Sequence, residues 1–189
     1  MTRRRYSNVI GFDDAPFDRE SREPVSIVGA VFAGPRFDGV LIGQVERDGT
    51  DAAAAIVGLL RRSRFAEHVR LILLQGITLA GFNVVDPFAV QIELGVPLLV
   101  VSRRRPDLAA VRETLLTHID GGPEKWAVIE RLGPMEPLGA LFVQRVGLSM
   151  EEARETIERF ALHGRMPEPI RAAHLIAGAL TRGASRGAP

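Results

Sequence analysis

Two apolar runs in the middle of the chain constrain its fold more than any other feature. Residues 69–74 and 96–101 are short, rich in branched aliphatic side chains, and followed by polar or glycine-containing sequence. Runs of this kind are typical of strands that are buried on both faces, as in the parallel part of an α/β sheet. Parallel strands need a crossover between them, and the helix predicted over residues 87–94 supplies one.

The remaining segments predict three antiparallel strands before this parallel part. Residues 6–12 predict the first strand, and residues 25–33 and 37–45 predict a hairpin that turns at Gly34-Pro35. The order indicates an α/β domain with a mixed sheet, three antiparallel strands followed by alternating helices and strands, flanked by helices. It is the order found in ribonuclease H-like nucleases. Several unrelated α/β domains share this order. Further helices are expected over residues 50–65, 106–118, 126–132, 149–162 and 168–182, and a last strand over residues 139–146.

Length and composition exclude several classes of protein. A chain of 189 residues fits one domain, 1–189, whose ends, 1–7 and 182–189, are expected to be flexible. The absence of cysteine excludes disulfides, zinc thiolates and thiol nucleophiles. No signal peptide and no apolar run near the ~20 residues of a membrane helix is found, so a cytoplasmic protein without membrane contact is expected. The net charge of +1 gives no general attraction to nucleic acid.

Several carboxylates follow the predicted strands. Asp13 and Asp14 come directly after the first strand, and because neighbouring side chains on a strand alternate, at most one of them is expected to enter a given pocket. Asp48 and Asp51 lie between the third strand and the first helix, and Asp86 precedes the next helix. Carboxylates gathered at one sheet edge suit Mg²⁺ or Mn²⁺. Taken singly, the last three also fit a turn and two helix starts.

The segment after the first buried run offers a candidate binding loop. Gln75-Gly-Ile-Thr-Leu-Ala-Gly-Phe-Asn83 carries Gly76 and Gly81 and is expected to expose Phe82 and Asn83 at the carboxyl edge of the sheet. A loop of this length without secondary structure of its own is usually functional. The alternative is a connection whose phenylalanine packs onto the core. The four histidines share no metal-binding spacing and are expected to cap helices or pack.

Four motifs resemble the archaeal endonuclease dU family, which is similar to endonuclease V. They are Ile10-Gly-Phe-Asp-Asp-Ala-Pro-Phe17, Arg47-Asp-Gly-Thr-Asp51, Gln75-Gly-Ile-Thr-Leu-Ala-Gly-Phe-Asn-Val-Val-Asp86 and Pro167-Glu-Pro-Ile-Arg-Ala-Ala-His-Leu-Ile-Ala177. The resemblance spans nearly the whole chain. It implies a ribonuclease H-like fold and metal-dependent cleavage of DNA that contains deoxyuridine, the product of cytosine deamination.

The resemblance also implies roles for individual residues. Asp13 and Asp51 match two acidic residues of endonuclease V, but Gln75 stands where that enzyme has a third carboxylate. Either Asp86 or Asp48 replaces the missing charge, or the DNA phosphate completes the metal site. The expected site therefore has catalytic Asp13, Asp51 and Asp86, a Mg²⁺ or Mn²⁺ ion on Asp13, Asp51 and Asp48, and a substrate-binding loop formed by Gln75, Gly76, Gly81, Phe82 and Asn83.

Two other functions remain open from the sequence. A non-catalytic nucleic-acid-binding protein that kept the nuclease fold would also carry a lost ligand at Gln75, because fold does not fix function. A small-molecule α/β enzyme could use the loop that follows Gln75. If the chain is a nuclease, as the resemblance implies, its expected partner is DNA containing deaminated bases.

Overall fold

The structure is a computed structural model that describes residues 6–18 and 20–185. Its main feature is a seven-stranded mixed sheet with the strand order β3-β2-β1-β4-β7-β9-β8. Strands β1 (Asn8–Asp14), β2 (Val25–Ala33) and β3 (Arg36–Val45) are antiparallel neighbours. Strand β4 (Leu71–Gln75) is parallel to β1, and β7 (Leu98–Ser102) is parallel to β4. The predicted mixed sheet, with its parallel part in the middle, is confirmed.

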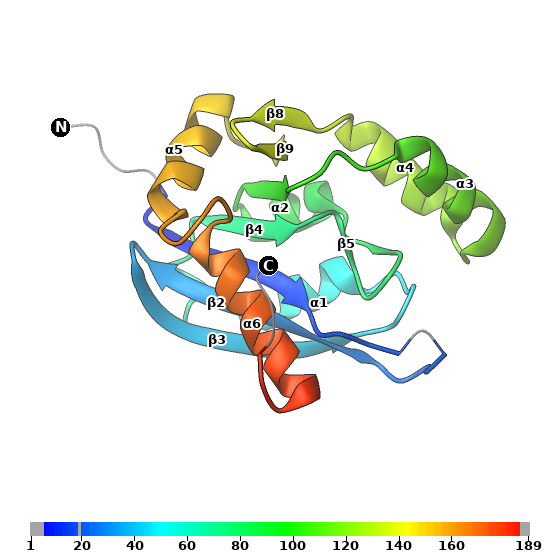
Figure 1. Ribbon diagram of the computed structural model, residues 1–189, viewed down its shortest axis with the longest axis horizontal. Helices are drawn as coiled ribbons and strands as arrows, with labels where there is room; N and C mark the ends of the chain where they lie inside the picture. The colour runs from blue at the N-terminus through cyan, green and yellow to red at the C-terminus, as the bar shows by residue number, and fades with distance from the viewer. Residues whose placement is uncertain (1–5, 19, 186–189) are drawn as a thin grey trace.

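Helices cover both faces of the sheet (Figure 1). On one face, α5 (Met150–Phe160) and α6 (Glu168–Arg182) pack in a cluster that includes Val9, Leu71 and Ala173. On the other face lie α1 (Ala52–Arg61) and α2 (Pro87–Leu94), with the cluster around Ile10, Ile72 and Ile56. Helices α3 (Leu108–His118) and α4 (Gly122–Leu132) form a hairpin that extends beyond the sheet. No helix in the described part of the chain is long and apolar enough to cross a membrane.

Several predicted boundaries were wrong by a few residues for local reasons. Strand β4 begins after Arg70, and β7 begins after Pro97, which cannot donate a ladder hydrogen bond. Helix α1 ends before Ser63, whose hydroxyl donates to the Leu60 carbonyl and accepts from the amide of Phe65. The last predicted strand, residues 139–146, corresponds to β9 (Leu141–Val146), and β9 pairs with a short strand that was not predicted, β8 (Glu136–Leu138).

The predicted loop after β4 has secondary structure of its own, contrary to expectation. A two-stranded hairpin of β5 (Thr78–Leu79) and β6 (Asn83–Val84) occupies it. Two residues in its turn have positive φ, Ala80 at 49° and Gly81 at 87°. The segment is therefore a shaped hairpin rather than an open loop. Of the ends predicted to be flexible, residues 1–5 and 186–189 lie outside the described part, whereas residues 6–7 and 182–185 are described and α6 continues to Arg182.

Candidate active site

Strand β1 presents one buried carboxylate to the face of the sheet that α6 covers. Asp13 is 5% exposed, and its Oδ1 atom accepts the backbone N–H of Asp14 at 3.0 Å. Its Oδ2 atom lies 2.8 Å from Nδ1 of His174 on α6. A carboxylate and an imidazole that are 161 positions apart in the chain therefore form a pair at the carboxyl end of the first strand.

The close approach of α6 to β1 positions His174. Gly11 lies two residues before Asp13, so its position faces α6 as well. A Cβ atom there would lie 2.4 Å from the carbonyl carbon of Pro169, in the first turn of α6. Any larger residue would therefore push the helix away from the strand. Glycine at this position lets α6 lie flat enough on β1 for the His174 ring to reach Asp13.

The pair changes the acidity of the imidazole. The hydrogen bond to Asp13 raises the pKa of His174 above its usual value, against the opposing effects of burial and of the positive charge of Arg103. The ring therefore carries its proton to a higher pH than a free histidine does. The prediction that every histidine caps or packs was wrong for His174. His174 lies within the fourth motif that resembles the family, and this position was the signal that could have identified it. The spacing of the four histidines gives no such signal.

Gln75 lies beside Asp13 on the neighbouring strand. The parallel register pairs Phe12 with Leu74, so one residue further brings Gln75 next to Asp13 on the same face. The Oε1 atom of Gln75 is buried and accepts no hydrogen bond from the described residues. A buried oxygen that accepts no hydrogen bond costs free energy, unless a cation or a water molecule contacts it. The structure thus places Gln75 next to Asp13.

The donor set around Asp13 fits a divalent cation only in part. Asp13 and Gln75 offer two oxygen atoms on one face, and Mg²⁺ is commonly held by one or two protein oxygens together with waters and substrate phosphate. No group of three or more His, Asp or Glu side chains that could hold a metal ion occurs in the described part of the chain. The residues therefore fit an ion that is completed by substrate and do not fit a site of three carboxylates.

Asp14 faces the opposite side of the sheet, so only one of the two aspartates enters the site, as predicted. Its Oδ2 atom accepts the backbone N–H of Ala80 at 2.8 Å, in the turn of the β5–β6 hairpin. Burial, and next the negative charge of Asp13, raise the pKa of Asp14 to about 6. The two adjacent carboxylates therefore connect the Asp13 site to the hairpin after β4.

The raised pKa of Asp14 predicts a pH-dependent loss of stability in the metal-free protein. An acid whose folded-state pKa exceeds its unfolded value, here about 6 against 3.8, destabilises the fold as pH rises between these values, and the penalty is complete above about 6. Asp14→Asn keeps an acceptor for Ala80 and removes the charge. We expect a gain of about 1–2 kcal/mol at pH 8, after a discount for partial exposure, and little gain at pH 4. Thermal melts in EDTA measure it, and equal gains at both pH values would contradict the assignment.

Asp48 holds the turn of the β5–β6 hairpin and does not face Asp13. Its backbone N–H donates to the carbonyl of Ala80 at 2.9 Å, and its Oδ1 atom accepts the N–H of Phe82 at 2.7 Å. A Cβ atom on Gly81 would lie 2.3 Å from that Oδ1 atom, so glycine is required there. Lys125 of α4 donates to the backbone carbonyl of Asp48 at 2.5 Å. The contacts assign Asp48 a structural task, which leaves its predicted role as a metal ligand without support.

Asn83 is fully buried, so the prediction that it is exposed was wrong. Its Nδ2 atom donates to the carbonyl of Glu46 at 2.8 Å and to Oδ1 of Asp51 at 2.6 Å. Its Oδ1 atom accepts the N–H of Ala52 at 3.1 Å, at the start of α1. All three contacts are internal. Asn83 cannot read a base edge while it makes them.

Asp51 and Asp86 also lie away from Asp13, at the starts of helices on the opposite face of the sheet. The Asp51 carboxylate accepts the N–H of Glu46 at 3.1 Å in addition to its bond from Asn83. Asp86 is the N-cap of α2, and its Oδ1 atom accepts the N–H groups of Phe88 and Ala89. The structure does not bring either carboxylate to Asp13. Asp86 makes the side-chain capping bonds that its residue type favours, whereas Asp51 stands at the N-cap position of α1 without a capping bond and is held by Glu46 and Asn83.

Phe82, Gly76 and Gly81 remain at the carboxyl edge of the sheet. Phe82 is partly buried against the cluster of Val84, Leu115 and Ile129, which joins the hairpin to α3 and α4. Gly76 has φ of 75°, and a Cβ atom there would meet nothing within 4 Å. The glycine therefore leaves open space directly after Gln75. Phe82 combines both expected behaviours, since one part of the ring packs and the other is accessible.

The model of the family described as endonuclease dU matches residues 5–181. The chain belongs to the endonuclease dU family. A UPF0215 protein of Deinococcus radiodurans is 52% identical over 183 residues, which cover 97% of this chain and 93% of the relative. A UPF0215 protein of Methanothermobacter thermautotrophicus is 38% identical, with 95% and 90% coverage, so relatives occur in bacteria as well as archaea.

Solved structures show the same fold for this member of the endonuclease dU family. A protein of unknown function from Archaeoglobus fulgidus has a TM-score of 0.85 at 34% identity, covering 92% of this chain and 97% of that one. Endonuclease V of Ciona intestinalis, solved with DNA containing an inosine followed by a ribo-adenosine, has a TM-score of 0.61 at 13% identity, covering 94% and 87%. The second likeness extends to the fold alone, and the predicted endonuclease V-like architecture is confirmed.

Proposed function

We propose that the chain is a metal-dependent endonuclease that cleaves DNA at deoxyuridine. The observation that carries the proposal is the pair formed by the buried Asp13 and the partly exposed His174, beside the orphaned oxygen of Gln75; Asp13 and Gln75 lie at the carboxyl ends of two parallel strands. Ligands bind at this edge in open α/β sheets. Membership of the endonuclease dU family supports the reaction and the substrate.

Asp13 and Gln75 would hold Mg²⁺ or Mn²⁺ together with an oxygen of the DNA phosphate. The bound ion supplies Lewis-acid polarisation of the phosphate and lowers the pKa of an attacking water. Asp13 provides the negative charge, and Gln75 adds a neutral oxygen. Because the protein contributes one charge, the substrate phosphate contributes a large share of the ion's binding energy.

His174 would move the proton. Its Nδ1 atom is held by Oδ2 of Asp13, which fixes the ring and leaves Nε2 to exchange a proton with water or with the leaving oxygen. Arg103 follows β7, and its charge reaches His174, as the effect on the pKa shows. Arginine suits a contact with a phosphate oxygen. Both cations would stabilise the negative charge that develops on the phosphate.

The damaged nucleotide would be held beside the hairpin that follows β4. Gly76 leaves open space after Gln75, and Gly81 with the accessible part of Phe82 forms the turn beyond it. A uracil must leave the base stack to reach such a site, which costs a few kcal/mol and is cheapest at a mispair. Asn83 holds this hairpin in place through its internal hydrogen bonds to Glu46, Asp51 and Ala52.

Cleavage of a labelled duplex with a single deoxyuridine tests the proposal. We expect a nick with Mg²⁺ or Mn²⁺, no nick in EDTA, and no nick in the matched duplex with cytosine. Tight binding without cleavage would favour a non-catalytic nucleic-acid-binding protein that kept the nuclease fold. Neither binding nor cleavage would favour a small-molecule enzyme.

Gln75→Glu tests the metal site directly, since glutamate has the same length and adds the missing charge. A second carboxylate next to Asp13 should bind the cation more strongly, so the dissociation constant for Mn²⁺ should fall by about tenfold or more. In EDTA the buried charge should lower the melting temperature, and Mn²⁺ should restore it. Calorimetric titration measures the affinity. An unchanged dissociation constant would place Gln75 outside the metal site.

A further inference from the structure

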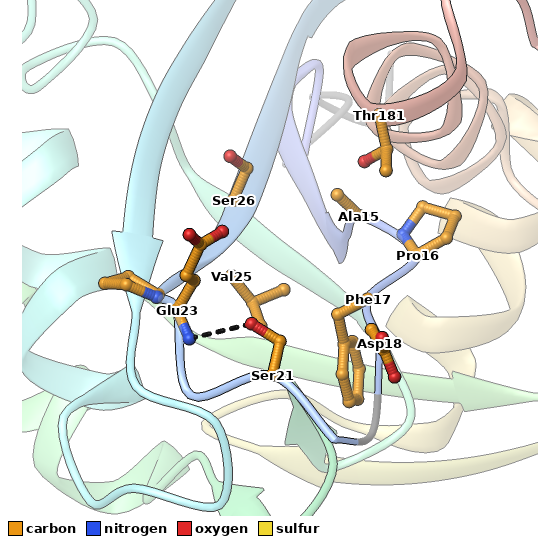
Figure 2. Close-up of a pocket in the computed structure, with 10 residues that line it drawn as sticks. Ala15, Pro16, Phe17, Asp18, Ser21, Glu23, Val25, Ser26 and Thr181 are labelled. Carbon is orange, nitrogen blue, oxygen red and sulfur yellow. Dashed lines mark hydrogen bonds between the residues drawn. The ribbon is translucent and has the colours of Figure 1, made fainter.

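A cavity of about 450 Å³ lies beyond the carboxyl end of β1, between the residues that follow Asp13 and the last turn of α6. Ala15, two residues after Asp13, forms one wall, and Asp18, Ser21 and Glu23 lie below it (Figure 2). Thr181 of α6 closes the opposite side, seven residues after His174. Seven residues are almost two helical turns, so Thr181 and His174 lie on one side of α6, about 10 Å apart along its axis.

The groups that line this cavity suit a nucleobase and not a phosphate. None of the described lining residues is Lys or Arg, whereas Asp18 and Glu23 carry negative charge. Ser26 and Thr181 add hydroxyl groups, which make no side-chain hydrogen bonds within the described part of the chain. Carboxylates and hydroxyls accept the N–H groups of a base edge. A volume of this size lies within the range of small-ligand pockets.

Apolar groups complete the walls. Phe17, Pro16 and Val25 border the cavity, and Figure 2 shows the Phe17 ring beside Ser21, on the side away from Thr181. A ring at this position offers a base a stacking surface, which binds any of the four bases because each has a π face. Phe17 also lies close to Gly81, so the same ring separates the cavity from the β5–β6 hairpin.

We propose that this cavity, lined by Ala15, Phe17, Glu23, Ser26 and Thr181, holds one unpaired base of the DNA strand that passes Asp13. The inference rests on the proposed function and deepens it. The base is not the damaged one, which lies beside the hairpin on the other side of Phe17. A distance of about 10 Å from His174 corresponds to about three nucleotide steps of a stacked strand, so the base lies within about three nucleotides of the cleaved bond.

A scan with abasic nucleotides tests the cavity. Each position up to four nucleotides on either side of the deoxyuridine is replaced in turn, and binding is measured by fluorescence anisotropy with Ca²⁺ as the cation. One position away from the damaged base should lose about ten- to hundredfold in affinity, the worth of one base on an aromatic platform. Thr181→Trp should fill the cavity, weaken binding of the intact strand and abolish the difference at that position.

Leu180→Trp is the matched control. Leu180 is 49% exposed, precedes Thr181 on α6 and does not line the cavity. This variant should show the wild-type abasic profile. The proposal is overturned if no flanking position is sensitive or if Thr181→Trp keeps the wild-type profile. Binding is read without cleavage, so a sensitive position in DNA that is never cut would sink the proposed reaction and leave the cavity's role intact.

Discussion

Asp13→Asn should slow the cleavage of uracil-containing DNA by about a thousand-fold and leave the fold intact. The change keeps the size of the side chain and removes the charge that holds both the cation and the proton on His174. Weaker binding of the cation should raise the activation free energy by about 4 kcal/mol, which slows the reaction about 10³-fold. Single-turnover cleavage at saturating Mn²⁺ measures this rate, and circular dichroism confirms folding.

Asp38→Asn provides the control for Asp13→Asn. Asp38 lies on the edge strand β3 and pairs with the exposed side chain of Arg36 at 2.6 Å, toward the amino end of β1, whereas Asp13 lies at its carboxyl end. Its replacement should leave the rate unchanged. A second consequence concerns pH: without Asp13, the pKa of His174 should return toward its ordinary value, which NMR of the imidazole measures. Asp13→Asn that cuts within a few-fold of the wild-type rate would remove Asp13 from the mechanism.

The sheet could be predicted because its signals are local. Each strand carries its own apolar run, and the turn at Gly34-Pro35 fixes the pairing of β2 with β3. The capping box that begins at Ser149 likewise marks the start of α5 within four residues. Alternation along a strand was sufficient to show that Asp13 and Asp14 face opposite sides. These features depend on neighbours in the sequence, so the sequence contains them.

The composition of the site could not be predicted in the same way. His174 meets Asp13 across 161 positions, and only the packing of α6 on Gly11 brings them together. Asp51 was expected to bind metal because the resemblance matches it to an acidic residue of endonuclease V, although its position also fits a helix start. That same position lets it bond to Asn83, from a hairpin 32 residues further along the chain. A carboxylate at a helix start is available to a ligand only if no other segment reaches it first.

Asn83→Ala should destabilise the protein by about 3 kcal/mol and leave the preference for uracil unchanged. The variant loses three buried hydrogen bonds and leaves the N–H of Ala52 and the carbonyl of Glu46 without their partner. Each such bond is worth about 1 kcal/mol, and an unsatisfied buried group costs at least as much. For a chain of this length the melting temperature should fall by about 6–12 °C.

Phe82→Ala separates this structural role from contact with the substrate. Its ring is only partly buried, so its removal should cost less stability than the removal of Asn83 while lowering affinity for uracil-containing DNA. The measurements are the affinity for uracil-containing DNA and the ratio of the affinities for uracil and cytosine duplexes, taken below the melting temperature of each variant. A side chain that holds β3, α1 and β6 together cannot be removed without a loss of stability. If Asn83→Ala melts like the wild type but no longer distinguishes uracil from cytosine, the amide therefore contacts the base and is not structural.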